Sequence, residues 1–232
     1  MSNDELRNEA PWRIGLRAAR ANVAPGLALQ IAALALVLAY YFHPPTHAAI
    51  EAVARVHERW GFRFSVISTA LFGGVIPVIY LRARASTRHQ FSIRGGVALI
   101  AFWAYKGFEV DLWYHTQAWL IGSEPTVRTV VIKMFLDQFV YCPVLAVPVT
   151  VLIVEWIHAN FCWAPVLADI GRGRWYRRRV LPVLISNFGV WVPAVCIIYA
   201  LPTALQLPLQ NLVLCFWTLL LAHVMQRREP AA

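Results

Sequence analysis

The chain alternates between long apolar runs and short polar linkers. Six apolar segments are each about as long as the roughly 20 residues that a helix needs to cross a bilayer. They cover residues 23–42, 62–81, 95–120, 129–157, 180–201 and 203–223. This pattern predicts an all-α protein, a polytopic transmembrane bundle with about six membrane segments. The bundle fills residues 23–225, between an N-terminal arm of residues 1–22 and a tail of residues 226–232.

Composition supports a membrane location. Hydrophobic residues make up 59% of the 232 positions and charged residues 14%, whereas a soluble domain carries about 25% charged residues. The formal net charge is +9. In a membrane protein, an excess of basic residues indicates topology and lipid headgroup contact before nucleic acid.

The basic residues alternate with the apolar segments. Arginine-rich stretches precede the first segment and follow the second, fourth and sixth, while the other linkers are balanced or nearly uncharged. Arg84 and Arg88 lie in the basic linker after the second segment, and Arg227 and Arg228 follow the sixth. The positive-inside rule then predicts six spans with both termini in the cytoplasm.

The linker after the first segment has a helical period of its own. Its apolar positions recur every three to four residues, at Ala49, Val53, Val56 and Trp60. With Thr46 as N-cap, the period predicts a short amphipathic helix in the membrane interface. Three histidines lie here, His43, His47 and His57. A shared metal site is one interpretation, but Pro44 and Pro45 separate His43 and His47 from helical register, so we expect the histidines to face solvent or lipid headgroups.

Charged residues inside the third and fourth segments are the main candidates for function. A charge at the centre of a membrane helix costs roughly 3 kcal/mol, so such residues face a protein interior or a wet cavity. Lys106 and Glu109 are three positions apart, and Lys133 and Asp137 are four apart, so each pair shares a helical face. The candidate polar network comprises Lys106, Glu109, Asp111, His115, Lys133, Asp137, Gln138 and Asn187.

The third and fourth segments are expected to form an antiparallel hairpin. Asp111 and Asp137 then lie level, Lys133 lies about one turn outward near His115, and Pro143 can kink the fourth helix. Two interpretations stay open. The charges form a satisfied ion-pair network that fixes helix register, or they line a water-filled path.

An arginine-rich stretch just before the fifth segment combines cations with aromatic residues. Its members are Arg172, Arg174, Trp175, Arg177, Arg178 and Arg179. Beside a membrane span, this composition predicts contacts with lipid headgroups rather than with nucleic acid. The four cysteines form no C-x-x-C pair, and no Ser/His or metal-ligand constellation is present. The sequence therefore predicts no metal site, no cofactor and no enzyme activity.

A set of spaced residues resembles a known family. It comprises Gly107, Trp113, Tyr114, Lys133, Met134, Asp137, Gln138, Pro143, Asn187, Phe188, Pro193 and Trp217. Their order is similar to that of the Mpv-seventeen and peroxisomal-membrane-protein-twenty-two family, which has a Trp-Tyr element, then Lys-Met-x-x-Asp-Gln, then Asn-Phe and Val-Pro. The match is best over residues 94–148. Phe108 stands where the family has proline.

The resemblance implies a weakly selective membrane pore for ions or small metabolites. We therefore expect a pore or channel with a charged path between the third and fourth segments. The alternatives are a proton- or cation-coupled secondary transporter and a non-conducting structural or lipid-organising protein. Expected partners are membrane lipids, small solutes or ions, and a second copy of the chain. Acidic residues near the N-terminus disfavour a transit peptide, so a bacterial inner membrane is favoured over an organelle membrane.

Overall fold

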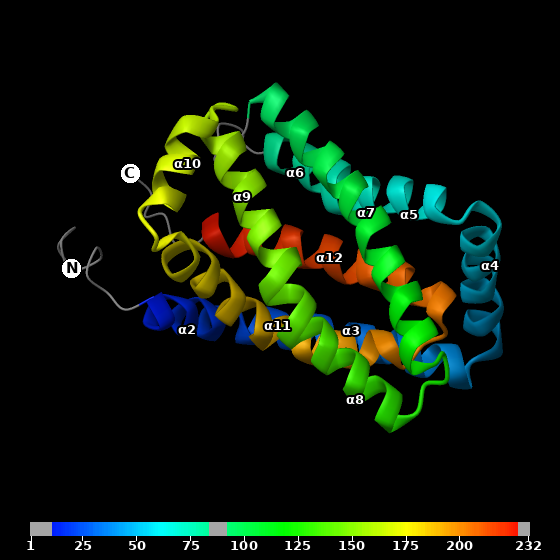
Figure 1. The fold of residues 1–232 in the computed structure, drawn as a ribbon. Coiled ribbons are helices and arrows are strands. Elements are labelled where there is room, and N and C mark those ends of the chain that lie inside the picture. The colour runs from blue at the N-terminus through cyan, green and yellow to red at the C-terminus, as the bar shows by residue number, and fades with distance from the viewer. Residues whose placement is uncertain (1–10, 84–91, 227–232) are drawn as a thin grey trace. The chain divides into compact units, whose positions relative to one another are not determined.

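The structure is a computed structural model that describes residues 11–83 and 92–226. Within these ranges the secondary structure is helical, without strands, as predicted (Figure 1). The six apolar segments correspond to α3 (Val23–Phe42), α5–η1–α6 (Phe62–Thr69, Ala70–Val75, Ile76–Ala83), α7 (Ile93–Ile121), α8–η2–α9 (Val127–Leu136, Asp137–Ala146, Val147–His158), η3–α11 (Tyr176–Val180, Leu181–Tyr199) and α12 (Thr203–Gln226). Three further helices are α2 (Pro11–Ala21), α4 (Pro44–Trp60) and α10 (Trp163–Gly171).

Four of these segments are long and apolar enough to cross a membrane, namely Val23–Phe42, Phe62–Ala83, Val127–His158 and Tyr176–Tyr199. The chain therefore has the composition of a multi-pass membrane protein. Helix α7 carries the charged residues Lys106, Glu109 and Asp111, and the membrane crossing of α7 and of α12 stays a prediction. Residues 1–10, 84–91 and 227–232, which include Arg84, Arg88, Arg227 and Arg228, lie outside the described residues.

The chain forms two compact units. The first unit contains residues 1–27 and 134–193, and the second contains residues 28–133 and 194–232. In the first unit, α2 packs on the start of α11, where a Cβ at Gly15 would lie 2.8 Å from the Cβ of Ile185. Near the same contact, the side chain of Asn22 donates a hydrogen bond to Ser186 at 3.2 Å. Residues of the predicted N-terminal arm thus form part of a packed helix.

In the second unit, α7 runs antiparallel to the segment α5–η1–α6 (Figure 1). Glycines let the two backbones approach closely, as small residues do at helix interfaces in membranes. A Cβ at Gly74 would lie 2.9 Å from the Cα of Ile100, and a Cβ at Gly107 would overlap the carbonyl oxygen of Ser65. The interface therefore tolerates no larger side chain at these two positions without a backbone shift.

Two of the apolar segments contain a stretch of π-helix at their centre. One is η1, which includes the buried glycines Gly73 and Gly74, and the other is η2, which includes Pro143. A proline inside a helix cannot donate the backbone hydrogen bond, so the local pattern must change. The predicted irregularity at Pro143 is thus present as a wider helix, a form common at functional sites.

Candidate functional site

Helix α7 buries several charged and amide side chains and exposes a stripe of apolar ones. The side chains of Lys106, Asp111 and Gln117 are 5%, 1% and 1% exposed. The opposite stripe of the helix is apolar and exposed, at Val97, Phe108, Leu112 and Trp119. A surface helix of a soluble protein has the opposite distribution, with its polar face outward and its apolar stripe inward. The distribution in α7 suits contact with lipid.

A cluster of buried polar side chains joins α7 to α4 and α5. Asp111 on α7 lies between His57 on α4 and Ser65 on α5. The Nε2 atom of His57 is 3.2 Å from Oδ2 of Asp111 and 3.2 Å from the hydroxyl oxygen of Ser65. Ser65 donates its hydroxyl proton to the same carboxylate oxygen. These three residues, all at most 3% exposed, are called the His57 cluster below.

The hydrogen-bond partners determine where the protons of the His57 cluster lie. The Nδ1 atom of His57 is 2.6 Å from the carbonyl oxygen of Ala204, so Nδ1 must carry a hydrogen and donate it. The other nitrogen, Nε2, then faces an acceptor carboxylate. In the imidazolium form Nε2 donates to the Asp111 carboxylate, and in the neutral form Nε2 is an acceptor that the Ser65 hydroxyl can reach. His57 is therefore the residue of the cluster whose hydrogen-bond role depends on its protonation.

The environment of His57 favours the imidazolium form. Burial alone lowers the pKa of His57, but the hydrogen bonds to Asp111 and to the Ala204 carbonyl raise it, as do the negative charges of Asp111 and Glu58. The net result is a pKa above the ordinary value. A cluster of this kind can bind or release a proton near neutral pH.

The position of His57 corrects a sequence-based expectation. His43 and His47 are exposed, as predicted, but His57 is 3% exposed and was wrongly assigned to solvent or headgroups. The apolar period of α4 predicts an amphipathic helix in the membrane interface, and its apolar residues Val53 and Val56 are exposed. The buried positions of the helix are Ala54 and His57. The same helix begins at Pro44 rather than after Thr46, because proline suits the first helical turn.

Gly107 places Ser65 against Asp111. Gly107 and Asp111 are four residues apart, so they lie on one face of α7. The missing side chain at Gly107 lets the α5 backbone at Ser65 contact the helix. That contact brings the Ser65 hydroxyl to the carboxylate one turn further on. A close helix contact thus sets the geometry of the polar cluster.

Asp111 also has an oxygen without a hydrogen bond. Its Oδ1 atom receives none from the described residues, and Nδ1 of His115 lies 3.4 Å away. The His115 ring instead contacts the backbone carbonyl of Asp111 at 2.9 Å, and its side chain is 54% exposed. The predicted network member His115 therefore lies at the open edge of the site.

The other predicted members of the second unit are Lys106, Glu109 and Lys133. Lys106 forms an ion pair with Glu109, as their spacing of three allows. Lys133 is 1% exposed, and its ammonium lies 6.0 Å from the centroid of the Tyr199 ring, within reach of a cation–π contact. Its backbone carbonyl accepts a hydrogen bond from Gln117 at 3.3 Å. Two acidic residues on α7 thus have different cationic partners, a lysine and a histidine.

Several polar residues of this region had not been singled out from the sequence. Thr69 donates to Asn211 at 2.9 Å, and Asn211 donates to Ser68 at 3.0 Å, which links α5 to α12. Tyr114 donates to Gln210 and links α7 to α12. A signal existed, because small polar and amide side chains inside apolar segments are few and must find partners. Nothing in their spacing, however, indicates which helix supplies the partner.

The remaining predicted network members lie in the first unit. Asp137 and Gln138 are 5% and 1% exposed, and the Gln138 amide donates to Asp137 at 2.8 Å. Asn187 is half-buried on α11. The level placement of Asp111 with Asp137 concerns both units and stays a prediction.

The arginine-rich stretch has partners within the first unit. Its five arginines are exposed, but Arg179 lies 3.1 Å from both Glu155 and Asp169. Trp175 donates its indole hydrogen to Glu155 at 2.7 Å. Trp175 and Arg179 thus fix helix packing, Arg172 lies 3.7 Å from Asp169, and the contacts of this stretch with headgroups stay a prediction.

The family-like residues lie in both units. Gly107 and Tyr114 belong to the packed face of α7, Trp217 is buried on α12, and Phe188 contacts Phe139 with ring centroids 5.3 Å apart. Comparisons of the chain with family models, with curated proteins and with solved structures give no match. Within residues 11–83 and 92–226, no three His, Cys, Asp or Glu side chains come together to hold a metal ion.

Proposed function

We propose that this protein lets ions or small solutes cross a membrane as a pore or channel, and that the inward face of α7 forms part of the route. The supporting observation is the inverted helix α7, with buried charges inside and apolar side chains outside. Ionisable residues inside membrane segments are commonly found on ion and proton pathways.

The length and outer face of α7 support its placement across the membrane. Its 29 residues extend about 43 Å at 1.5 Å per residue, more than the roughly 30 Å hydrocarbon core. Trp119 near one end is 83% exposed, and Val97 near the other is 62% exposed. If α7 and α12 both cross the membrane, they and the four candidate segments make up the predicted six spans. The arrangement of basic linkers then gives both termini in the cytoplasm. We further propose a bacterial inner membrane, a homo-oligomer, no enzyme activity, and membership of the family that the sequence resembles.

Unpaired acceptor oxygens support a cation or proton as the species that passes. Oδ1 of Asp111 and the side-chain oxygens of Gln117 and Gln206 are buried and receive no hydrogen bond from the described residues. Buried polar atoms are normally satisfied by protein or by ordered water. All three atoms are acceptors, so they suit a hydrated cation or water better than an anion.

A proton-coupled secondary transporter is the second candidate. The His57 cluster favours it, because a buried histidine in contact with a carboxylate can couple proton uptake to a change of structure. A nucleophilic enzyme is not favoured. In a catalytic triad the serine and the acid contact opposite nitrogens of the histidine, whereas Ser65 and Asp111 both contact Nε2 of His57.

Reconstitution into a planar lipid bilayer tests the proposed function and separates the candidates. A pore or channel is expected to give discrete current steps that bilayers without protein lack. A coupled transporter gives no steps but takes up solute into vesicles when a proton gradient is imposed. If the folded protein does neither, the polar contacts serve only to fix helix packing, and the proposal of a route is wrong.

A further inference from the structure

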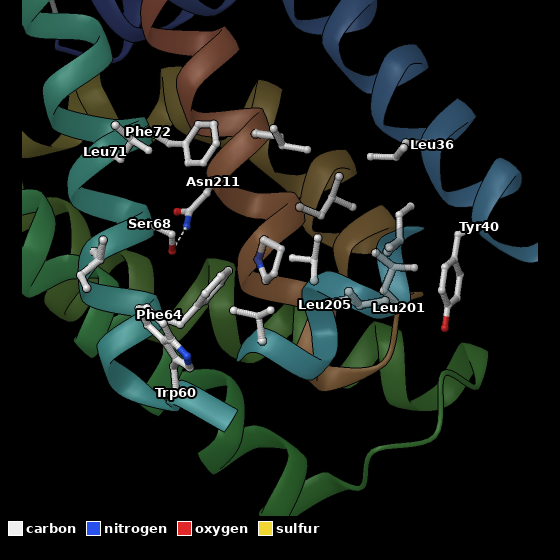
Figure 2. A pocket seen from close by; sticks show the side chains of 17 residues that line it. Leu36, Tyr40, Trp60, Phe64, Ser68, Leu71, Phe72, Leu201, Leu205 and Asn211 are labelled. Carbon is white, nitrogen blue, oxygen red and sulfur yellow. Dashed lines mark hydrogen bonds between the residues drawn. The ribbon is translucent and has the colours of Figure 1, made fainter. Parts of the chain in front are cut away.

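An apolar pocket of about 500 Å³ lies in the second unit beside α4. Figure 2 shows side chains from several helices around it, among them Trp60 of α4, Phe64 of α5 and Leu205 of α12. Tyr40 on α3 closes another part of the wall. Its volume is within the range of about 300–1,000 Å³ that is usual for ligand sites in proteins. It is called the α4 pocket below.

The lining of the α4 pocket is mostly apolar and offers an occupant few polar groups to bind. No charged side chain lines it, and Ser68 and Asn211 are its two amide or aliphatic hydroxyl side chains. These two bond to one another at 3.0 Å (Figure 2), and Asn211 also accepts from Thr69. The phenol of Tyr40 donates to Glu51 at 2.6 Å. Since these polar groups already have partners, hydrocarbon is the chemistry that fits the remaining surface.

The place of the pocket in the chain indicates where the hydrocarbon comes from. The α4 helix connects two segments that are apolar and long enough to cross a membrane, Val23–Phe42 and Phe62–Ala83. Both of these segments contribute to the lining. A helix that connects two such spans lies at one membrane surface, so the pocket lies beside the part of the lipid tails next to the headgroups rather than in bulk water.

The apolar side of α4 is only partly covered by the described chain. Val53, Val56 and Trp60 line the pocket, and they are 40%, 44% and 53% exposed. Exposed apolar area costs about 25 cal/mol per Å² in water, and patches of this kind mark binding sites. On the opposite side of the same helix, His57 contacts Asp111. One side of α4 is therefore packed on the protein, and its apolar side is available to an occupant of the pocket.

We propose that the α4 pocket binds one acyl chain of a membrane phospholipid, whose headgroup stays at the surface beside α4. The inference uses the membrane placement of the chain and does not depend on the passage of solutes. A bound chain covers the apolar face of α4 and fills the space between that helix and α12. It is distinct from the surrounding lipid because it is held in a pocket of defined volume.

Native mass spectrometry of the purified protein tests this site. The probe is 1-palmitoyl-2-oleoyl-phosphatidylcholine, added to the detergent micelles from which the protein is released. We expect one lipid adduct that survives mild activation. Ile67→Trp places a larger side chain at a lining position that is 57% exposed, and its adduct is expected to fall at least about tenfold, the equivalent of 1.4 kcal/mol.

The matched control is Ile79→Trp, at a position 63% exposed that does not belong to the pocket lining. It introduces the same change on the same apolar segment and should keep the wild-type adduct. A second pair covers the case in which Ile67→Trp fails to fold: Val53→Trp in the lining against Val97→Trp, 62% exposed on α7. Two results would overturn the proposal. One is an equal abundance of the lipid adduct in the lining and control variants; the other is a continuous series of adducts in which a single bound lipid is not preferred.

Discussion

Each of the two units contains a contact between an acidic and a basic side chain, and the two contacts differ in burial. In the second unit, His57 and Asp111 approach to 3.2 Å with side chains 3% and 1% exposed. In the first unit, Arg179 approaches Asp169 to 3.1 Å, with side chains 56% and 19% exposed. The distances are nearly equal, so distance alone does not distinguish the contacts.

Burial determines what each contact contributes. Exposed ion pairs contribute about 0–1 kcal/mol, because water and salt screen them. A buried pair gives little net stability against an apolar replacement, but the loss of one partner leaves a charge without compensation and costs about 3–5 kcal/mol. The loss of one partner should therefore destabilise the protein strongly at the His57 cluster and only slightly at the Arg179 contact.

The largest effect is expected for His57→Leu, which leaves Asp111 buried without its cationic partner. The free energy of unfolding should fall by about 3–5 kcal/mol, measured by thermal or denaturant unfolding in detergent. The double variant His57→Leu with Asp111→Leu removes both charges and should recover most of the loss. If the single variant unfolds like the wild type, the contact is not a buried ion pair.

Gly107→Ala should have the next largest effect. The added Cβ would overlap the carbonyl oxygen of Ser65, so α5 and α7 must separate, and overpacking of this kind costs about 1–3 kcal/mol. Gly171→Ala is the matched control, because a Cβ there meets nothing within 4 Å. Equal melting temperatures for the two variants would show that α5 and α7 do not approach closely at Gly107.

A smaller effect is expected from pH. The pKa of His57 is raised in the folded protein above its ordinary value of about 6.5, so folding favours the protonated form. This contribution is fully present below about pH 6.5 and is lost as the pH rises through the raised pKa of the folded state. The melting temperature should fall over that range. His57→Gln, which cannot titrate, should show a flatter profile; an unchanged slope would place the titrating group elsewhere.

The smallest effect is expected for Arg179→Gln in the first unit. Glu155 and Asp169 lose a partner, but their side chains are 21% and 19% exposed and water replaces it. The free energy of unfolding should change by less than about 1 kcal/mol. A loss as large as that of His57→Leu would remove the distinction between the two contacts.

Residue patterns predicted the helices well, because apolar runs of membrane length constrain the chain locally. The first predicted segment, residues 23–42, coincides with α3. The pairing of Lys106 with Glu109 also follows from local spacing, since three residues make nearly one helical turn. Pro143 indicated an irregular helix, although its π-helical form was not foreseen.

Contacts between distant segments could not be predicted. His57 and Asp111 are 54 positions apart, so no local spacing indicates that they meet. The period of α4 predicts an amphipathic helix with an exposed apolar face, but it does not show which polar side chain of that helix packs against the protein. The role of Gly107 is similar, because a glycine in a helix gives no sign of which backbone will contact it.

We propose that Asp111, on the inward face of α7, lies on the route by which solutes cross the membrane. The most direct test is solute flux into vesicles that contain the reconstituted protein, measured as a function of pH for Asp111→Asn and for the matched control Asp169→Asn. Asn keeps the shape of the side chain and removes its charge. We predict that Asp169→Asn keeps the flux and pH response of the wild type, while Asp111→Asn changes the flux and shifts the pH response to lower pH, because His57 loses the carboxylate that raises its pKa. If folded Asp111→Asn behaves like Asp169→Asn in both respects, the route does not involve Asp111 and the account is contradicted.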